Sequence, residues 1–315
     1  MSYPADSVTG GFMTRLQADV ALLTDRRYTA PVAAAGDWYL GNILREDDLV
    51  RAALGRLGLT SARVDWADPD VDWSRFRCAV FRTTWDYFNR LPEFLAWLDR
   101  VGRHTRLCND PATVRWNLDK HYLADLDRRG VPVVPTRYID RGSDATLAGL
   151  LDATGWAEAV VKPCVSGAAR HTYRVDRATA DAVQAVVGPL LAGESFLLQP
   201  FLRDVVRTGE DTLMVIDGRF THAVRKVAKA GDFRVQDDHG GTVHDRTPTA
   251  EQVALAERAV AACAPAPSYG RVDMVRDDEG RLVVMELELI EPELWLRNHP
   301  PAATALAEAI RKVID

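Results

Sequence analysis

Acidic residues and one arginine alternate along a stretch near the carboxyl end of the chain, residues 270–292. Asp277 to Gly280 is a turn signal between two apolar runs, which predicts a β-hairpin. If Glu279 and Gly280 form a two-residue tip, position 273 faces 286 and position 271 faces 288. Because side chains alternate along a strand, one face then carries Arg271, Asp273, Glu286 and Glu288. Carboxylates beside a guanidinium suit Mg²⁺ and phosphate oxygens, whereas an ordinary hairpin would expose the same face to water.

Three further segments place cations where they could bind phosphate. Lys162 ends an apolar strand and precedes a loop of small residues that includes Ser166 and Gly167. An ammonium and backbone N–H groups can close on a phosphate in such a place. Arg234 lies in a loop bounded by glycines, and Lys120 lies in a predicted helix. The alternative interpretations are an ordinary hairpin, a plain surface loop and a solvated helix lysine.

Aromatic and charged side chains follow two of the first predicted strands. Ligands of open α/β sheets bind at the carboxyl ends of the strands, and an arginine beside aromatic residues suits an amino-acid-like ligand. We therefore expect a substrate-facing wall made of Arg26, Tyr28, Trp38, Arg82, Trp85, Asp86 and Tyr87. The alternative is that these aromatic residues pack at a domain interface.

Composition excludes several classes of protein. The 315 residues carry a net charge of −6 without a basic block, which argues against nucleic acid as a partner. No apolar stretch approaches the roughly 18–20 residues that span a bilayer, and the first residues lack the features of a secretory signal. Four cysteines without CxxC spacing are expected to be reduced, so we expect a cytoplasmic protein without a membrane partner. The GxxxxGK[ST], GxGxxG and HExxH motifs are all absent, which disfavours phosphate-loop enzymes, dinucleotide binding and zinc proteolysis.

The order of the predicted elements indicates α/β followed by α+β structure. Apolar runs over 18–24, 63–66 and 78–82, with a helix over 47–57, predict βαβ units and a parallel sheet. A helix over 111–129 begins a second unit near Asn109. Beyond it, antiparallel hairpins are predicted, with strands over 159–165, 171–175, 196–199, 212–216, 220–226, 270–275 and 282–290 and helices over 177–192, 249–263 and 302–313.

Taken in order, these segments resemble the ATP-grasp superfamily of carboxylate-activating ligases, and within it the glutathione-synthetase and RimK-like branch. The loop 231–241, GDFRVQDDHGG, is similar to that branch's G[DE]xRxNxxxGG pattern, with Gln236 in place of the usual Asn. The run RVD…ELELIEP is similar to the D…ExN…P metal pattern, with Glu288 in place of Asn. A narrower similarity is to the O-ureido-serine cyclo-ligase family of cycloserine biosynthesis, through residues 72–76, 81–85, 115–126 and 286–292.

The resemblance implies an ATP-grasp fold with an N-terminal parallel-sheet domain (16–108), a central lobe (109–190) and a C-terminal lobe with the metal site (191–315). ATP would lie between the two lobes. For the nucleotide, the implied residues are Lys120, Lys162, Ser166 and Gly167 at the phosphates, Gln199, Phe201 and Leu202 at adenine, and Asp204 or Glu210 at the ribose. Mg²⁺, or Mn²⁺, would be held by Asp273, Glu286 and Glu288, with Arg234 and Arg271 as catalytic cations and His239, Gly240 and Gly241 on the substrate side.

The implied activity is an ADP-forming C–N ligase. A small, amino-acid-like carboxylate would become an acyl phosphate, and a nitrogen nucleophile would then form an amide or close a ring. The alternative is an ATP-binding protein or phosphotransferase without ligase turnover. The expected partners are a small carboxylate and an amine, and the protein is expected to be a monomer or a homodimer.

Overall fold

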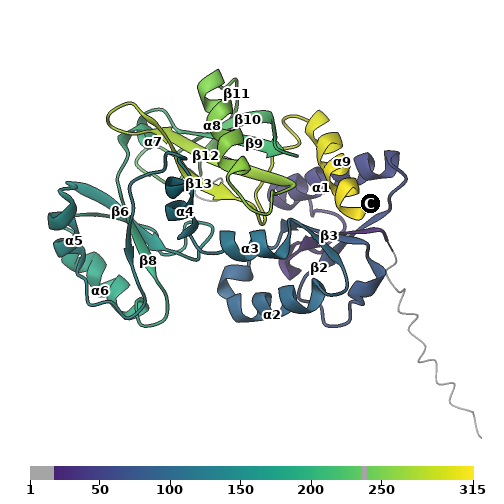
Figure 1. Ribbon diagram of the computed structural model, residues 1–315, viewed down its shortest axis with the longest axis horizontal. Helices are drawn as coiled ribbons and strands as arrows, with labels where there is room; N and C mark the ends of the chain where they lie inside the picture. Colours follow the sequence, from purple (N-terminus) through teal and green to yellow (C-terminus); the bar gives the residue numbers. More distant parts are fainter. Residues whose placement is uncertain (1–17, 236–239) are drawn as a thin grey trace, which may run out of the picture.

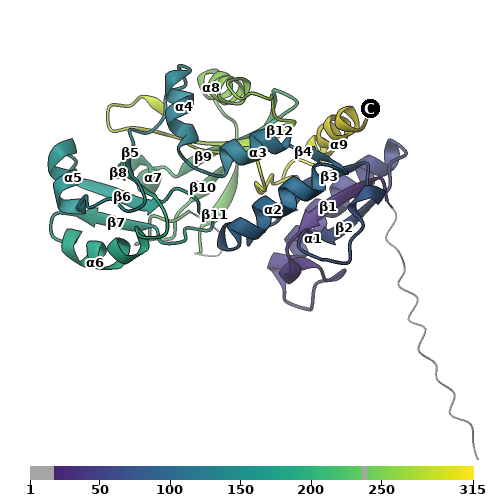
Figure 2. The same ribbon diagram turned by 60° about the horizontal axis from the view of Figure 1, so that its bottom comes forward.

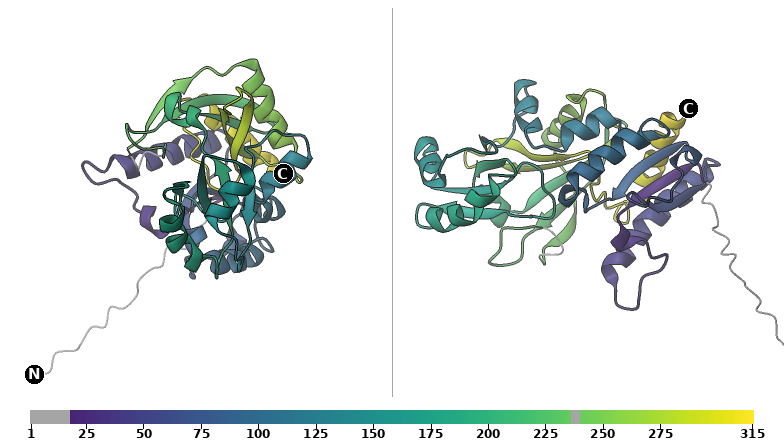
Figure 3. Two further views of the ribbon diagram at one scale, coloured as in Figure 1. Left: turned by 90° about the vertical axis from the view of Figure 1, so that its left-hand side faces the viewer. Right: turned by 90° about the horizontal axis from the view of Figure 1, so that it is seen from below.

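A computed structural model describes residues 18–235 and 240–315. In this part of the chain, strands β1–β13 form three sheets, and each sheet is built from consecutive strands of the sequence. The molecule is elongated: the first sheet and its helices lie at one end, the second sheet lies at the other, and the third lies between them (Figures 1 and 3). Among the described residues, no helix is long and apolar enough to cross a membrane.

The first sheet is parallel, as predicted, and has the strand order β2-β1-β3-β4. Residues of β1 alternate between two cores: Val20 and Leu22 face one, Ala21 and Leu23 the other. Helices α1 and α9 cover the first core and α2 covers the second (Figure 2). The elements are β1 (Val20–Thr24), α1 (Trp38–Arg56), β2 (Ser61–Asp65), β3 (Cys78–Thr83), α2 (Leu91–Val101), β4 (Arg106–Cys108) and α9 (Pro301–Ile314), with 3₁₀ turns η1 (Arg26–Tyr28), η2 (Trp73–Arg75) and η3 (Tyr87–Asn89).

Helix α1 begins earlier than the predicted start at residue 47. The Asp37 side chain accepts a hydrogen bond from the backbone N–H of Leu40, 3.0 Å away, and so caps the helix.

The single helix predicted over 111–129 is wrong. Two helices, α3 (Pro111–Asn117) and α4 (Tyr122–Arg128), are separated by a short break that contains Lys120. The Lys120 N–H donates to the carbonyl of Cys164, 2.9 Å away in the next unit. The Asp119 carboxylate accepts the His121 N–H at 3.0 Å. Because these bonds replace helical ones, Lys120 is held as part of a connection rather than on a solvated helix face.

The second sheet is antiparallel, with the order β5-β8-β6-β7, and has its own apolar core. Its strand β8 lies beyond the domain boundary expected at residue 190. The elements are β5 (Arg137–Ile139), α5 (Leu147–Thr154), β6 (Glu158–Pro163), β7 (Tyr173–Asp176), α6 (Ala180–Leu190) and β8 (Phe196–Pro200).

The third sheet is also antiparallel, with the order β11-β10-β9-β12-β13. Helices α4 and α8 pack on one face, while Met214 and Ile216 on the other face share a core with α1 and α9. The first and third units are therefore joined by one continuous core. The elements are α7 (Arg203–Arg207), β9 (Glu210–Ile216), β10 (Arg219–Val227), β11 (Thr242–Arg246), α8 (Ala250–Ala261), β12 (Tyr269–Arg276) and β13 (Leu282–Glu288).

The segment between β13 and α9 is held from two sides. The Glu46 carboxylate on α1 accepts the backbone N–H groups of Leu296 and Arg297, at 2.9 and 2.8 Å. His222 on β10 donates from Nε2 to the carbonyl of Leu294 at 2.8 Å, and its ring stacks on His299. Burial lowers the pKa of His222 to about 4.

We expect His222 to make the protein less stable as the pH falls from about 6.5 to 4. In this range the imidazole is protonated in the unfolded chain but stays neutral in the folded protein. The contribution of His222 to the free energy of unfolding is therefore fully present above the unfolded pKa and is lost as the pH falls below it, by roughly 3 kcal/mol in total. Urea unfolding at several pH values measures the slope. His222→Gln should flatten it and His104→Gln, at an exposed position, should not; equal slopes in the two variants would contradict the assignment.

Candidate active site

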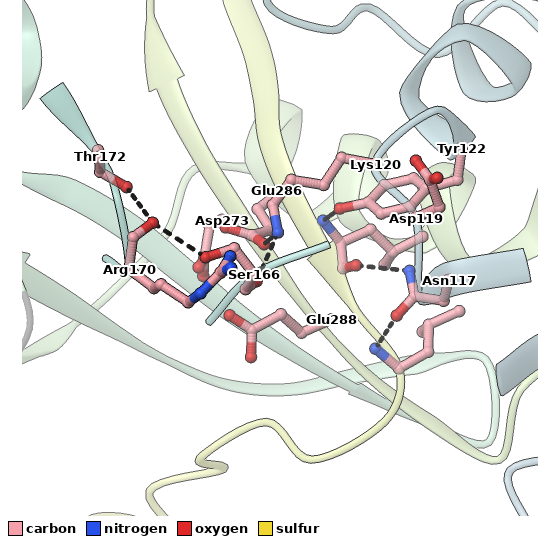
Figure 4. A network of polar contacts seen from close by, with 12 residues as sticks. Asn117, Asp119, Lys120, Tyr122, Ser166, Arg170, Thr172, Asp273, Glu286 and Glu288 are labelled. Carbon is pink, nitrogen blue, oxygen red and sulfur yellow. Dashed lines mark hydrogen bonds and ion pairs between the residues drawn. The ribbon is translucent and has the colours of Figure 1, made fainter. Parts of the chain in front are cut away.

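A cavity of about 520 Å³ lies where the three units meet. The hairpin β12–β13 forms its base, and the end of β6 and the loop after it form one side. Another side is formed by residues of the first unit, namely Trp85, Tyr87, Phe88 and Asn89. Figure 4 shows the carboxylates of the hairpin beside Lys120 and the loop at Ser166.

The predicted hairpin register is confirmed at the four charged positions. Arg271 lies opposite Glu288, and Asp273 lies opposite Glu286. The register shifts after Asp273, so the strands toward the tip pair one position differently from the simple two-residue hairpin. The shift leaves the four charged side chains on the face toward the cavity.

Each carboxylate of the hairpin has a cation beside it. Asp273 accepts from Arg271 at 2.8 Å and from Lys226 at 2.9 Å. Glu286 lies 3.1 Å from the Lys120 ammonium, and Glu288 contacts Arg271. The cluster is therefore a network of alternating charges and not a surface exposed to water.

The pKa values in this network differ according to the neighbours. Burial disfavours the ionised carboxylates, but Arg271 and Lys226 hold the pKa of Asp273 below its ordinary value. Burial similarly opposes ionisation of Glu286, whose pKa is nevertheless lowered by Lys120 and Lys162. The pKa of Glu288 is raised to about 7, because burial and repulsion from the other two carboxylates exceed the attraction of Arg271.

The donor set fits a hard divalent cation. Asp273, Glu286 and Glu288 supply carboxylate oxygens on one side of the hairpin, which is the ligand chemistry of Mg²⁺. In this structure each carboxylate contacts a cation, with Asp273 and Glu288 sharing Arg271, and burial together with repulsion from the other two carboxylates raises the pKa of Glu288. A divalent cation among them would remove that repulsion.

Lys162, near the end of β6, and Lys120, in the break between α3 and α4, both line the cavity. Burial lowers the pKa of Lys162, and Glu286 offsets only part of this effect. Within the described residues, no carboxylate lies within 4.0 Å of its ammonium, whereas Lys120 is paired with Glu286 and also donates to the Ser166 carbonyl at 2.8 Å. Lys162 is thus a partly buried cation suited to an anionic ligand.

The loop after Lys162 approaches the first unit closely. A Cβ atom added to Gly167 would lie 2.7 Å from the ring of Phe88, so only glycine allows this contact. The Ser166 hydroxyl donates to the Arg170 carbonyl at 3.1 Å, and Arg170 is paired with Glu194. The small residues of the loop therefore let it lie against the N-terminal wall of the cavity.

Lys226 on β10 is a cavity residue that the sequence reasoning missed. It is buried between Asp273 and Glu210, and it contacts both. Glu210, expected at a ribose, is therefore ion-paired in this structure, and burial raises its pKa despite Lys226. A lysine at the end of an apolar predicted strand was the available signal, and it is the same signal that identified Lys162.

The expected substrate wall is only partly at the cavity. Tyr28, Trp85 and Tyr87 line it. Tyr28 packs edge-on against Trp85, with ring centroids 5.5 Å apart, and both lie about 6 Å from Tyr39, which was not predicted. The Trp85 indole N–H donates to the Glu291 carbonyl at 3.0 Å, which joins this wall to the segment after β13.

Two other residues of the expected wall, Arg82 and Asp86, are used inside the first unit instead. Arg82 is buried beneath it, where its guanidinium contacts Asp47 at 3.1 Å and Glu46 at 3.7 Å. Asp86 accepts from Trp66 at 2.7 Å and from Arg90 at 2.9 Å. Both side chains make their contacts inside the first unit: Arg82 lies on β3, whose residues are all buried, and Asp86 directly precedes η3.

Some of the remaining expected site residues line the cavity and others do not. Gln199, Phe201, Leu202 and Arg234 line the cavity, and Arg234 is paired with Asp232 at 2.7 Å. Arg26, Trp38, Asp204, Gly240 and Gly241 are not among the described residues that line it. His239 lies outside the described residues.

Two antiparallel lobes around a cavity with buried lysines and a carboxylate hairpin define a protein of the ATP-grasp class. The model of the prokaryotic glutathione synthetase ATP-grasp domain matches residues 136–264, and that of the N-terminal domain of D-cycloserine synthetase DcsG matches residues 20–109. The chain is 41% identical over 272 residues to the cycloserine biosynthesis protein DcsG of Streptomyces lavendulae, covering 81% of this chain and 89% of that protein. The chain belongs to the family of this protein.

Solved structures agree with this assignment. The crystal structure of D-cycloserine synthetase DcsG superposes with a TM-score of 0.78 at 36% identity, covering 94% of this chain and 99% of that one. The RimK domain ATP-grasp protein of Sphaerobacter thermophilus has the same fold, with a TM-score of 0.65 at 20% identity over 93% of this chain and 99% of that one. ATP-grasp relatives are ATP-dependent carboxylate–amine ligases that use divalent metal ions. The chain is accordingly an ATP-grasp ligase that forms a C–N bond.

Proposed function

We propose that this ligase uses Mg-ATP to activate a small amino-acid-like carboxylate and that a nitrogen of the same substrate then closes a ring. The observation that carries the proposal is the meeting of the carboxylate hairpin, the buried lysines and the aromatic wall in one cavity. Ring closure, rather than joining of two molecules, is favoured by the 41% identity to a cycloserine biosynthesis protein.

The cations of the cavity would neutralise charge during the first step. A carboxylate oxygen attacks the γ-phosphorus, the bond to the bridging oxygen breaks, and acyl phosphate and ADP form. Because both reactants are anions, Arg234 and Arg271 on the substrate side, with Lys120 and Lys162 at the α- and β-phosphates, would offset their repulsion. Electrostatic contacts of this kind contribute about 3–4 kcal/mol each in other enzymes.

The remaining residues would position the nucleotide and keep water out. Gln199, with the backbone at Phe201 and Leu202, would contact adenine. Glu210 would contact the ribose once its ion pair with Lys226 is broken. Asp273, Glu286 and Glu288 would hold Mg²⁺, which supplies charge neutralisation at the phosphates when bound. The loop that carries Arg234 would shield the acyl phosphate from hydrolysis while the substrate nitrogen displaces phosphate.

The test measures ADP release with a panel of amino-acid-like carboxylates, with and without hydroxylamine. A true substrate should stimulate ADP release, and hydroxylamine should trap the acyl phosphate as a hydroxamate. ADP release without hydroxamate would favour a phosphotransferase. If no carboxylate stimulates ADP release and the Lys162→Ala and Glu286→Ala variants behave like the wild type, the proposal fails.

Removing an aromatic side chain of the wall should weaken carboxylate binding. Tyr28→Ala should raise KM for the carboxylate about tenfold, since the ring supplies contact area at the cavity and supports Trp85. KM for ATP should stay within about twofold. Val32→Ala, at an exposed position of the same loop, is the matched control. A rise in KM for ATP alone would place the wall on the nucleotide side instead.

A further inference from the structure

We propose that Asp119, His121 and Cys164 form a binding site for Zn²⁺ that is separate from the carboxylate hairpin. One carboxylate oxygen, one ring nitrogen and the sulfur of these residues all lie within 4.8 Å of one another. In a tetrahedral zinc site, ligand atoms lie roughly 3.3–3.8 Å apart, so small side-chain movements would complete the site. Within residues 18–235 and 240–315, it is the one group of such side chains that converges in this way.

The chemical types of the three ligands favour zinc over magnesium at this site. A thiolate with an imidazole and a carboxylate suits zinc, whereas the all-oxygen set on the hairpin suits Mg²⁺. The two sites share no ligand. Lys120 lies between Asp119 and His121 in the sequence, but its ammonium points to Glu286.

The imidazole of His121 is held in place from several sides. Its Nδ1 lies 2.5 Å from an oxygen of Asp119, and its Nε2 lies 3.6 Å from an oxygen of Asp140. With Nδ1 as the metal-binding nitrogen beside Asp119, Nε2 faces Asp140, a carboxylate of the kind that orients a zinc-bound histidine. The ring also stacks on Tyr138, with centroids 4.2 Å apart and planes inclined by 19°.

The site is half open to solvent. The side chains of His121 and Asp119 are 40% and 45% exposed, while Cys164 is buried behind them. A metal ion can thus enter from solution, and water can fill the fourth position. On binding, the Cys164 thiol loses its proton to solvent and its sulfur becomes a metal ligand.

A metal at this place would connect two parts of the active-site scaffold. Asp119 and His121 lie in the break between α3 and α4, and Cys164 follows β6. The Lys120 N–H already donates to the Cys164 carbonyl across this junction. Zinc would reinforce the same junction and so restrict the backbone on both sides of Lys120 and of the Ser166 loop.

The experiment measures metal binding by the full-length protein in saturating Mg²⁺, without ATP. Zn²⁺ affinity is measured by competition with a chromogenic chelator, and Co²⁺ replaces Zn²⁺ to report a thiolate-to-cobalt absorption band. The wild type should bind one equivalent and show the band. Cys164→Ser should lose the band and at least about 100-fold in affinity, and His121→Gln should also weaken binding. Cys263→Ser, which alters another buried free cysteine, should match the wild type.

The outcomes separate this site from the catalytic one. Glu286→Gln should keep Zn²⁺ affinity unchanged, since it alters the hairpin only. No binding by the wild type, an unchanged band in Cys164→Ser, or loss of zinc in Glu286→Gln would each overturn the proposal. If Cys164→Ser proves unfolded by circular dichroism, His121→Gln, at a partly exposed position, decides the question.

Discussion

Lys162→Met should lower carboxylate-dependent ADP formation by about 10²–10³-fold, the usual loss when one preorganised electrostatic contact is removed. Lys162 lines the cavity, and no carboxylate of the described chain lies within 4.0 Å of its ammonium. The attraction of this partly buried charge is therefore available to an anionic ligand instead of being used in an internal ion pair. Steady-state kinetics with ATP and the carboxylate measures the loss.

The same variant should fold at least as stably as the wild type without ligand. A buried ammonium without a close counter-ion is costly, and methionine of similar length removes that cost. Thermal unfolding with and without ATP tests this, because ATP should stabilise the wild type more than the variant. Lys312→Met changes an exposed lysine and should alter neither quantity. Lower stability combined with normal turnover would show that Lys162 is structural.

Glu286→Gln should cause a loss of similar size and should also change the dependence on metal. Glu286 lies 3.1 Å from Lys120 and shares a face with Asp273 and Glu288. The substitution removes a charged metal ligand and leaves Lys120 without its carboxylate partner. We therefore expect turnover to fall by at least about 10²-fold and the Mg²⁺ concentration for half-maximal rate to rise.

The measurement is ADP formation over a range of Mg²⁺ concentrations at fixed ATP. Glu279→Gln, at the exposed tip of the same hairpin, is the matched control. A Glu286→Gln variant with lower turnover but an unchanged Mg²⁺ dependence would assign Glu286 to positioning Lys120 alone. Since Glu286 helps to raise the pKa of Lys120 and offsets part of the burial that lowers the pKa of Lys162, the variant should also lose activity at a lower pH on the alkaline side.

The local pattern of apolar, charged and turn residues was enough to predict the hairpin and its charged face. Strand alternation has a period of two, and the turn between two apolar runs sets which positions face each other, so Asp273 and Glu286 could be paired without a structure. The register shift after Asp273 was not visible, because a bulge depends on packing against neighbouring strands.

Contacts between residues distant in the sequence explain why three charged residues were wrongly placed or overlooked. Lys120 was predicted on a helix, but a hydrogen bond from its N–H to Cys164 ends helix α3 before it. Arg82 was expected at the cavity, but acidic residues of α1 bury it in an ion-paired network. Lys226 went unnoticed because its partners, Glu210 and Asp273, come from other strands.

The sequence by itself determined the family, the order of the elements and the kinds of side chain available for chemistry, because motif residues and their spacing are local properties of the chain. Only the tertiary structure decided which charges meet. Lys162 and Lys120 were both candidate phosphate-binding cations in the sequence, but in the fold Lys120 is paired with Glu286, whereas no carboxylate of the described residues lies within 4.0 Å of the Lys162 ammonium. The physical reason is that the energy of a buried charge depends on the groups within a few ångströms of it, and those groups come from distant parts of the chain.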